Sequence, residues 1–404
     1  MIFWRSKWGE TLSKLNKLLF FVWIVLLSVL VYVMNIWELE RPQSEIIQTS
    51  GQLEEPVEEV IQVQPSKEQL AIEQLSKEPP IQEEVIKKET IKLAMIGDIL
   101  LHKRLGHYED YSPSFEPVES ILQSYDYLIA NQESLPVGNK FEISGYPQFS
   151  SPDYILRDLQ EAGVDLVNIA NNHTVDKGEA GVQTLFENLD IYNTPYIGAF
   201  KSQQDAEKAR VSELGSIKIG FLSYTYSTNG LYLPKDSPFI INYIDEEKIL
   251  QDVAAMKDTV DVTAVLLHWG DEYNTQENDN QRHLAKLLND AGVDIILGTH
   301  PHVIQPYQKL VSGQGKETHV FYSIGNFYSS ILVKPDTMVG GVASLSITKE
   351  GEKITIDQPT FVSTAVLKDS DGVYRVYPLK ETEALATHDI QWVQQILGEQ
   401  VIVQ

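Results

Sequence analysis

The sequence of 404 residues contains no cysteine. This absence excludes disulfide bonds, thiolate nucleophiles and zinc sites with cysteine ligands, and it suits a protein that works outside a cell without oxidative folding. Positive charge is also scarce, because 32 Lys and Arg residues stand against 57 Asp and Glu residues, a formal net charge of −25. The C-terminal region has no basic stripe, so nucleic acid is not an expected partner. The hydrophobic share of 43% is ample for a packed core.

A long apolar run near the N-terminus predicts a membrane anchor. Residues 18–37 read LLFFVWIVLLSVLVYVMNIW, about the 20 residues that a helix needs to cross a bilayer. Basic residues precede the run and acidic residues follow it, so residues 1–17 are expected in the cytoplasm and the rest outside the membrane. A cleaved signal peptide is the alternative. We favour an uncleaved single-pass anchor, because the run exceeds a usual signal core and no A-x-A-like cleavage site follows it.

Composition divides the remainder of the chain into three parts. Residues 38–90 are rich in Glu, Gln, Pro, Ile and Lys, as in GQLEEPVEEV, which predicts a disordered, acidic and flexible linker. A partner-binding role for this linker is the alternative. Residues 91–380 are predicted to fold as one extracellular domain, and residues 381–404 to form a C-terminal helical tail.

Alternating strand and helix patterns predict an α/β fold for the domain. Helical patterns include SPDYILRDLQEAG, GVQTLFENLDIY and NQRHLAKLLNDAG, and two of these end in Ala-Gly before a new strand, as a glycine C-cap would. Residues 340–378 are strand-like and are expected to close the sheet. The apolar, β-branched strand segments are Lys92–Ile96, Tyr127–Ala130, Leu166–Ala170, Ile217–Ser223, Thr263–Leu267, Asp294–Leu297 and His319–Ser323.

Six of these predicted strands end in clusters of polar side chains. The carboxyl ends of strands in an α/β sheet converge on one crevice, so the clusters are expected to lie side by side. Carboxylates, imidazoles and amide oxygens are the ligands that Mn²⁺, Fe²⁺, Zn²⁺ or Mg²⁺ takes where thiolates are absent, which predicts a divalent metal site. The clusters are Gly97–Asp98, Asn131–Glu133, Asn171–His173, His268–Glu272, Gly298–His302 and Ser323–Asn326.

Each cluster also has a structural interpretation. Asp98 could cap a helix, an Asn could occupy a left-handed turn, and His268 could be a hydrogen-bonded core histidine. Independent structural roles at all six strand ends would be a coincidence. We therefore favour one metal site that the clusters share. The role of His102 stays open, and the remaining histidines are interpreted as structural or exposed: His107, His283, His319 and His388.

Taken in order, the motifs IGD, NQES, NIANNHTVDKG, LLHWGDEY, GTHPHVIQP and FYSIGNF resemble the CapA family of bacterial capsule and poly-γ-glutamate synthesis proteins over about residues 92–330. Domains of this family resemble calcineurin-like metallophosphoesterases, which implies a metallophosphatase-like, layered α-β-β-α sandwich after the transmembrane helix and disordered linker. The resemblance implies two divalent metal ions, with Mn, Fe, Zn and Mg all open. The implied ligands are Asp98, Glu133, Asn172, His268, His300 and His302, with His173 beside the metals as the catalytic proton donor.

Two departures from the phosphoesterase pattern concern its first two motifs. Asn131 and Glu133 stand where the phosphoesterases carry a bridging Asp in a Gly-Asp pair. The Asp-x-His of the first motif is also absent, since His102 lies four residues after Asp98. Phosphatase activity is therefore not implied.

The resemblance implies a membrane-anchored member of the complex that makes or exports poly-γ-glutamate, with its domain outside the cell membrane. Its partners would be synthase subunits and an anionic polymer or small envelope substrate. A metal-dependent hydrolase of envelope phosphoesters or amides is one alternative, a metal site that only grips carboxylates is another, and a non-catalytic scaffold of the synthase is a third. The other polar residues of the clusters are candidates for substrate binding: Asn131, Asn171, Glu272 and Asn326.

Overall fold

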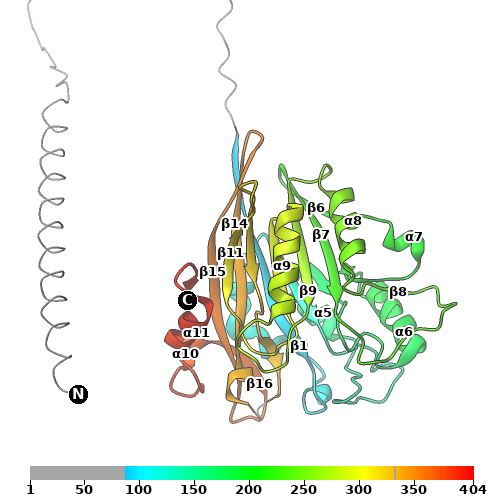
Figure 1. Cartoon of the computed structure of the whole chain (residues 1–404). Helices are drawn as coiled ribbons and strands as arrows, with labels where there is room; N and C mark the ends of the chain where they lie inside the picture. The colour runs from blue at the N-terminus through cyan, green and yellow to red at the C-terminus, as the bar shows by residue number, and fades with distance from the viewer. Residues whose placement is uncertain (1–86, 332–333) are drawn as a thin grey trace, which may run out of the picture. The chain divides into compact units, whose positions relative to one another are not determined.

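The computed structural model describes residues 87–331 and 334–404. The predicted cytoplasmic segment, membrane anchor and nearly all of the predicted linker lie outside these residues. Among the helices of the described part, none combines the length and the apolar character that a membrane crossing needs. The described chain has a mixed α/β fold, as predicted, built on two main sheets (Figure 1).

The first main sheet has nine strands and contains both ends of the described chain. Its central strand β1 pairs in parallel with β2 and β13 and antiparallel with β14. The hairpin β14–β15 then extends the sheet, as the strand-like pattern of residues 340–378 predicts. The strands are β1 (Lys88–Leu100), β2 (Tyr127–Gln132), β3 (Leu166–Asn168), β4 (Tyr196–Ile197), β13 (Asn326–Ser329), β14 (Val339–Glu350), β15 (Lys353–Lys368), β16 (Tyr374–Pro378) and β17 (Ile402–Val403).

The second main sheet has six strands in the order β11-β12-β10-β9-β7-β6. Its four central strands are parallel, and the two edge strands run antiparallel to their neighbours. A separate two-stranded ribbon pairs β5 (Ala199–Phe200) with β8 (Ile240–Ile241). The six strands are β6 (Arg210–Leu214), β7 (Ile217–Thr225), β9 (Val262–His268), β10 (Ile295–Thr299), β11 (Tyr307–Val311) and β12 (Glu317–Phe321).

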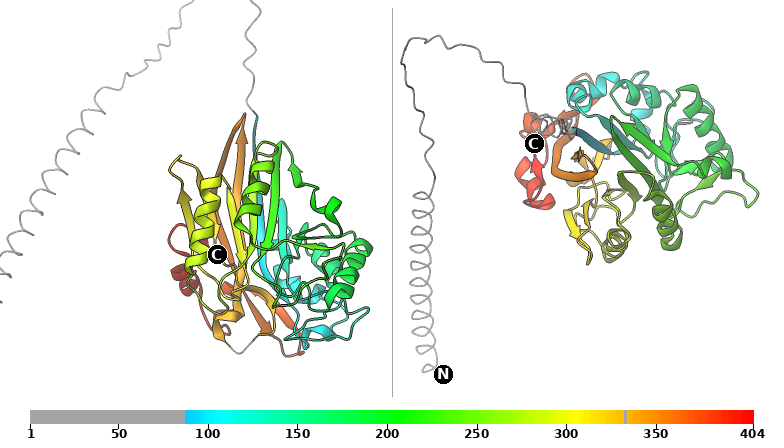
Figure 2. Two further views of the ribbon diagram at one scale, coloured as in Figure 1. Left: turned by 45° about the vertical axis from the view of Figure 1, so that its right-hand side comes forward. Right: turned by 90° about the horizontal axis from the view of Figure 1, so that it is seen from above.

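Alternation along the strands places the two sheets face to face with helices on their outer faces. In β1, Leu93 and Met95 belong to the apolar cluster between the sheets, whereas Ala94 and Ile96 pack in the cluster that holds α5 and α6. In β9, Leu266 faces the same inter-sheet cluster, and its neighbours pack against α8 and α9. The four layers are helix, sheet, sheet and helix (Figure 2).

The helices begin and end where local chemistry allows. Asn278 and Gln281 form a capping box at the start of α9, and Gly292 ends that helix in the left-handed conformation, with φ of 98°. Gly163 follows α5 with φ of 107°, so both predicted Ala-Gly helix ends are present. The helices are α3 (Ser112–Phe115), α4 (Glu119–Leu122), α5 (Ile155–Glu161), α6 (Gly178–Ile191), α7 (Gln203–Ala206), α8 (Glu246–Met256), α9 (Asp279–Ala291), α10 (Leu379–Thr382) and α11 (Ile390–Leu397), with 3-10 turns at Leu105–His107, Glu116–Val118 and Pro335–Met338.

The C-terminal segment that was expected to be a helical tail packs on the first sheet. Val393 and Leu397 of α11 share the apolar cluster of Phe361 in β15, and β17 pairs in parallel with β15. The segment therefore contains a strand as well as a helix, and its contacts tie it to the domain.

Candidate metal centre

The six side chains predicted as metal ligands come together where strands of both sheets end. Three follow or end strands of the first sheet, β1 to β3, and three follow or end β9 and β10 of the second. Because the sheets pack face to face, their carboxyl edges meet, and the polar clusters gather at one place. All six are at least 96% buried: Asp98, Glu133, Asn172, His268, His300 and His302.

Asp98 is positioned by a close approach between β1 and the segment before β13. A Cβ on Gly97 would lie 1.9 Å from the carbonyl oxygen of Gly325, so only glycine allows this contact. The register of β1 shifts around Asp98, which aligns with Asn131 of β2 and Asn326 of β13. The bulge therefore presents the carboxylate of Asp98 at the sheet edge.

A buried amide network holds one oxygen of this carboxylate. Asn131 Nδ2 donates to Asp98 Oδ1 over 2.7 Å, and Asn168 Nδ2 donates to Asn131 Oδ1 over 2.9 Å. The other oxygen, Asp98 Oδ2, lies 3.1 Å from Nδ1 of His302. The same Nδ1 is 3.1 Å from Oδ1 of Asn326. Asp98 is thus fixed on one side and directed into the cluster on the other.

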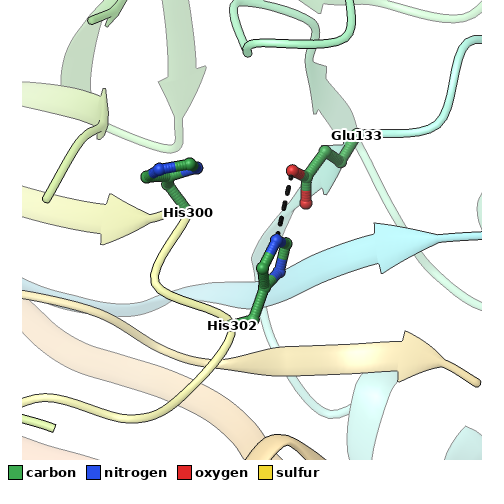
Figure 3. A group of neighbouring side chains, drawn as sticks. All are labelled: Glu133, His300 and His302. Carbon is green, nitrogen blue, oxygen red and sulfur yellow. Dashed lines mark ion pairs between the residues drawn. The ribbon is translucent and has the colours of Figure 1, made fainter. Parts of the chain in front are cut away.

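Glu133, His300 and His302 form a compact group of potential ligands (Figure 3). One ligand atom from each residue lies within 4.8 Å of the others. Glu133 Oε1 is 3.7 Å from His302 Nε2 and 3.6 Å from His268 Nε2. His300 and His302 have positive φ angles of 98° and 59°, a rare conformation for histidine that holds both rings at this position.

The two remaining predicted ligands contact each other. His268 Nε2 lies 2.9 Å from Asn172 Oδ1, and His268 Nδ1 lies 3.0 Å from Thr299 Oγ1. Thr299 thereby fixes the orientation of the ring from behind, as a partner on the second ring nitrogen does for a metal-binding histidine. The amide oxygen and the imidazole nitrogen thus face each other within the cluster.

Unpaired polar atoms test whether this cluster fits a metal ion. In the described part of the chain, both carboxylate oxygens of Glu133 and Nδ1 of His300 are buried without a hydrogen-bond partner, and Asp98 Oδ2 has only its 3.1 Å contact with Nδ1 of His302. Leaving such atoms unpaired costs stability, and most buried polar groups avoid it. Carboxylate oxygens and imidazole nitrogens are the donors that divalent cations take in proteins. The residues present therefore fit a divalent metal ion.

Burial and mutual proximity change the pKa values of the cluster. Burial and the neighbouring histidines hold the pKa of His268 and His300 well below the usual value, so both rings are neutral at neutral pH. Burial raises the pKa of Glu133 well above its usual range, and the charges of Asp98 and Glu272 add to this effect. Burial alone would lower the pKa of His302, but Glu133 and Asp98 outweigh it and raise the pKa to about 10. Neutral imidazoles are the form that binds metals, so His268 and His300 are ready to bind, whereas a metal ion at His302 would displace the proton that balances the acidic groups in its absence.

His173 and Asp176 form a hydrogen-bonded pair beside the cluster. His173 Nδ1 lies 2.7 Å from Asp176 Oδ2, which also accepts a hydrogen bond of 2.6 Å from the backbone N–H of Phe149. The Phe149 ring packs edge-on against the imidazole, with centroids 4.6 Å apart. This arrangement fixes the ring and leaves Nε2 for the adjoining cavity. A carboxylate in this position orients a histidine that transfers protons.

A cavity of about 430 Å³ opens onto the cluster and defines the candidate substrate cleft. Asn172 and His302 of the ligand set line it, as do His173 and Glu272. No lysine or arginine is among the described residues that line the cleft. Its other walls are Leu100, His102, Tyr146, Pro147, Gln148, Phe149, Asp176, Asn229, Leu231, Tyr273 and Ile331.

The four residues predicted to bind substrate have different surroundings. Glu272 lines the cleft, but Asn131, Asn171 and Asn326 are buried and are not among its lining residues. Asn171 donates to the backbone oxygen of Gln132 and accepts from the backbone N–H of the following His173. The three asparagines contact Asp98, His302 and the backbone of His173 with their side chains. Their geometry therefore favours a role in positioning these residues over contact with substrate.

The structure also adds residues to the site that the sequence interpretation did not select. Asp176, the partner of His173, stands three residues after it in the same motif, a spacing that could have indicated the pair. Asn168 could have been recognised as the first amide of NIANN. Phe149 and Tyr146 come from a loop without any pattern that marks them. His102, whose role was left open, lines the cleft, and burial lowers its pKa to about 4.

Comparison with known proteins agrees with the resemblance seen in the motifs. Residues 92–330 match the family model described as bacterial capsule synthesis protein PGA_cap, and the chain belongs to this family. The PGA biosynthesis protein CapA of Bacillus subtilis (strain 168) is 29% identical over 250 residues, which cover 59% of this chain and 63% of that protein. The capsule biosynthesis protein CapA of Bacillus anthracis is 28% identical over 311 residues, which cover 71% of this chain and 72% of that protein. The match thus spans less than two thirds of the first relative.

Among solved structures, the calcineurin-like phosphoesterase YfkN from Bacillus subtilis is similar at 16% identity and a TM-score of 0.42. The match covers 77% of this chain and 96% of that chain.

Proposed function

We propose that this protein is a metal-dependent component of poly-γ-glutamate capsule synthesis and that it acts on the polymer or holds it. Family membership and the names of the two CapA relatives support the capsule role. One observation carries the metal dependence: six buried side chains from two sheets converge at one cleft with ligand atoms that have no hydrogen-bond partner among the described residues. The layered metallophosphatase-like fold is part of the same proposal.

The proposed ligands of two divalent ions are the six predicted residues. A bound divalent ion would polarise a carbonyl or phosphoryl oxygen and lower the pKa of a bound water. Glu133 and Asp98 would supply negative charge, while neutral His268 and His300 would supply nitrogen ligands. His173, held by Asp176, would give or take a proton at the cleft through Nε2.

The proposal places the domain outside the cytoplasmic membrane, anchored by residues 18–37. Support comes from the length of that apolar run and from the basic residues before it. In this position the protein would meet the polymer as it leaves the synthase and would contact other subunits of that complex. Protease added to wall-stripped intact cells should remove the domain. Complete protection of the domain would refute this topology.

Metal content tests the central claim. The full chain should carry close to two equivalents of divalent metal by elemental analysis after mild dialysis. His268→Ala should lose most of this metal, whereas His283→Ala should keep it, because His283 is an exposed residue of α9 paired with Glu246. A wild-type protein with less than about half an equivalent, unrestored by Mn²⁺ or Zn²⁺, would refute the metal site.

A second candidate function is hydrolysis of an amide or phosphoester in the cell envelope. The hydrogen-bonded His173–Asp176 pair favours it, because a site that only grips carboxylates has no use for an oriented proton donor. A non-catalytic scaffold would tolerate loss of the metal ligands. Complementation of a deletion strain with His268→Ala separates the scaffold from both metal-dependent functions.

A further inference from the structure

A second cavity adjoins the candidate substrate cleft. It has a volume of about 500 Å³ and shares Tyr146, Pro147 and Gln148 with the cleft as a common wall. Tyr146 is 80% exposed, so a large aromatic side chain stands at the border between the two cavities. A ligand that fills the cleft and continues past this border enters the second cavity, which we name the lysine groove after Lys103 and Lys177 in its lining.

The two cavities differ in charge. The described lining of the cleft contains the carboxyl groups of Asp176 and Glu272 and no lysine or arginine. The lysine groove contains Lys103 and Lys177 and one acidic residue, Glu142. His302 carries the only raised histidine pKa among the described residues of the cleft lining, and its proton is held by Glu133 and Asp98. Carboxylates of an anionic ligand therefore find lysine side chains only after they leave the cleft, among the residues that line these two cavities.

Lys177 is held in place for such a contact. Its Nζ donates to Ser144 Oγ over 3.0 Å and to the backbone oxygen of Gln148 over 3.2 Å. An ammonium group has three N–H donors, so one donor remains after these two bonds. Both acceptors are neutral, and neither Lys103 nor Lys177 forms an ion pair with a carboxylate of the described residues. The ammonium group of Lys177 is thus fixed in position without a direct ion pair among the described residues.

We propose that the lysine groove is a binding subsite for a carboxylate of a γ-glutamyl chain, one or more units away from the unit in the metal cleft. This inference rests on the proposed function, because it takes the ligand to be the capsule polymer. A polymer with one carboxylate per unit presents its charges in series. One unit then occupies the acidic cleft at the metal cluster while a neighbour pairs with Lys177 and Lys103. The groove thereby selects a chain over a single unit.

Binding measurements with probes of two lengths test the subsite. A γ-glutamyl decamer and a γ-glutamyl dipeptide are titrated by calorimetry into the Mn²⁺-loaded full chain. Lys103→Gln and Lys177→Gln should each weaken decamer binding about two- to fivefold, the range for one partly exposed ion pair, and leave dipeptide binding unchanged. Lys177→Arg should retain decamer binding. Lys353→Gln, the same change at the exposed start of β15, should have no effect.

The outcomes separate this inference from the proposed function. Equal decamer binding by wild type and both glutamine variants overturns the subsite while the proposed function stands. Weaker dipeptide binding in Lys103→Gln also overturns the subsite, because that lysine would then act through the cleft. A wild-type protein that binds neither probe overturns the proposed function and this inference with it.

Discussion

Two neighbouring parts of β1 are equally buried, but one is apolar and the other is polar. Met95 is fully buried in the apolar cluster between the sheets, where every neighbour adds to stability. Asp98 is also fully buried, but one of its carboxylate oxygens faces the polar cluster, where its contact among the described residues is Nδ1 of His302 at 3.1 Å. The first environment stabilises the fold, and the second costs stability that a bound cation would recover. The strand therefore supplies rigidity at one position and a residue of the candidate metal centre three residues later.

The largest expected effect belongs to the polar end of this comparison. His173→Ala removes the proposed proton donor but none of the proposed ligands. We expect activity to fall by about 10²–10⁴-fold, the usual range for loss of a general acid or base, with metal content and melting temperature nearly unchanged. Polymer production in a complemented deletion strain, at matched protein levels, measures the effect. Full function would favour a site that only grips carboxylates, and loss of metal would show that His173 is itself a ligand.

The apolar end is tested by Leu266→Ala. Leu266 of β9 is fully buried between the sheets, so its truncation leaves a cavity in a packed interior. We expect the free energy of unfolding to fall by about 2–5 kcal/mol in urea denaturation, while the folded fraction still binds metal. Leu385→Ala is the matched control, because Leu385 is 74% exposed. Equal effects of the two substitutions would contradict the assignment of the inter-sheet core.

Glu133→Gln should affect stability and metal affinity in different ways, which sharpens the comparison between the apolar core and the polar cluster. The substitution removes a buried carboxylate that has no donor, so the metal-free protein should keep its stability or gain up to about 2 kcal/mol. Metal affinity should fall more than about tenfold, since an anionic ligand is lost. Calorimetry and urea denaturation measure the two quantities, with exposed Glu207→Gln as the control. A large loss of stability without metal would show that Glu133 is a structural residue.

The smallest expected effect is the pH dependence of the metal-free protein. The depressed pKa of His268 and His300 means that the unfolded chain takes up their protons first, so stability falls as pH drops below about 6.5. His302 has a raised pKa of about 10, so its contribution is complete below about 6.5 and is lost as pH rises through 10. The melting temperature in EDTA should therefore peak near pH 6.5 and fall by several degrees on either side. A flat profile between pH 5 and 9 would contradict these pKa shifts.

Much of this site could be predicted from the sequence, because parallel strands bring their carboxyl ends to one edge. That rule brought Asp98, Glu133 and His268 together although they are far apart in the chain. The pattern also indicated the helix ends at Gly163 and Gly292, where the backbone requires a left-handed residue. These features follow from local chemistry and from one general property of α/β sheets.

The remainder depends on contacts between distant segments. Polar residues at strand ends look alike in sequence, and only packing decides that Asn131 supports Asp98 while Glu272 lines the cleft. Nothing periodic marks the loop that supplies Tyr146 and Phe149. Its contacts are with a distant segment, as in the hydrogen bonds from the Phe149 backbone N–H to Asp176 Oδ2 and from Lys177 Nζ to Ser144 Oγ. Asn131, Asn171 and Asn326 are buried and are not among the residues that line the cleft, a difference from Glu272 that their positions in the sequence do not reveal, and their contact with substrate stays a prediction.

The extent of β1 has a mechanical consequence. From Lys88 to Asp98 the strand runs about 33 Å at roughly 3.3 Å per residue, paired on one side with β14 and on the other with β2. A pull applied to the chain at residue 88 acts along the strand, so its inter-strand hydrogen bonds resist together in shear rather than opening one by one. If the protein is tethered through the preceding residues, tension from a growing capsule enters at the end of β1 opposite Asp98. The candidate metal centre then lies where the load has already been shared among the neighbouring strands.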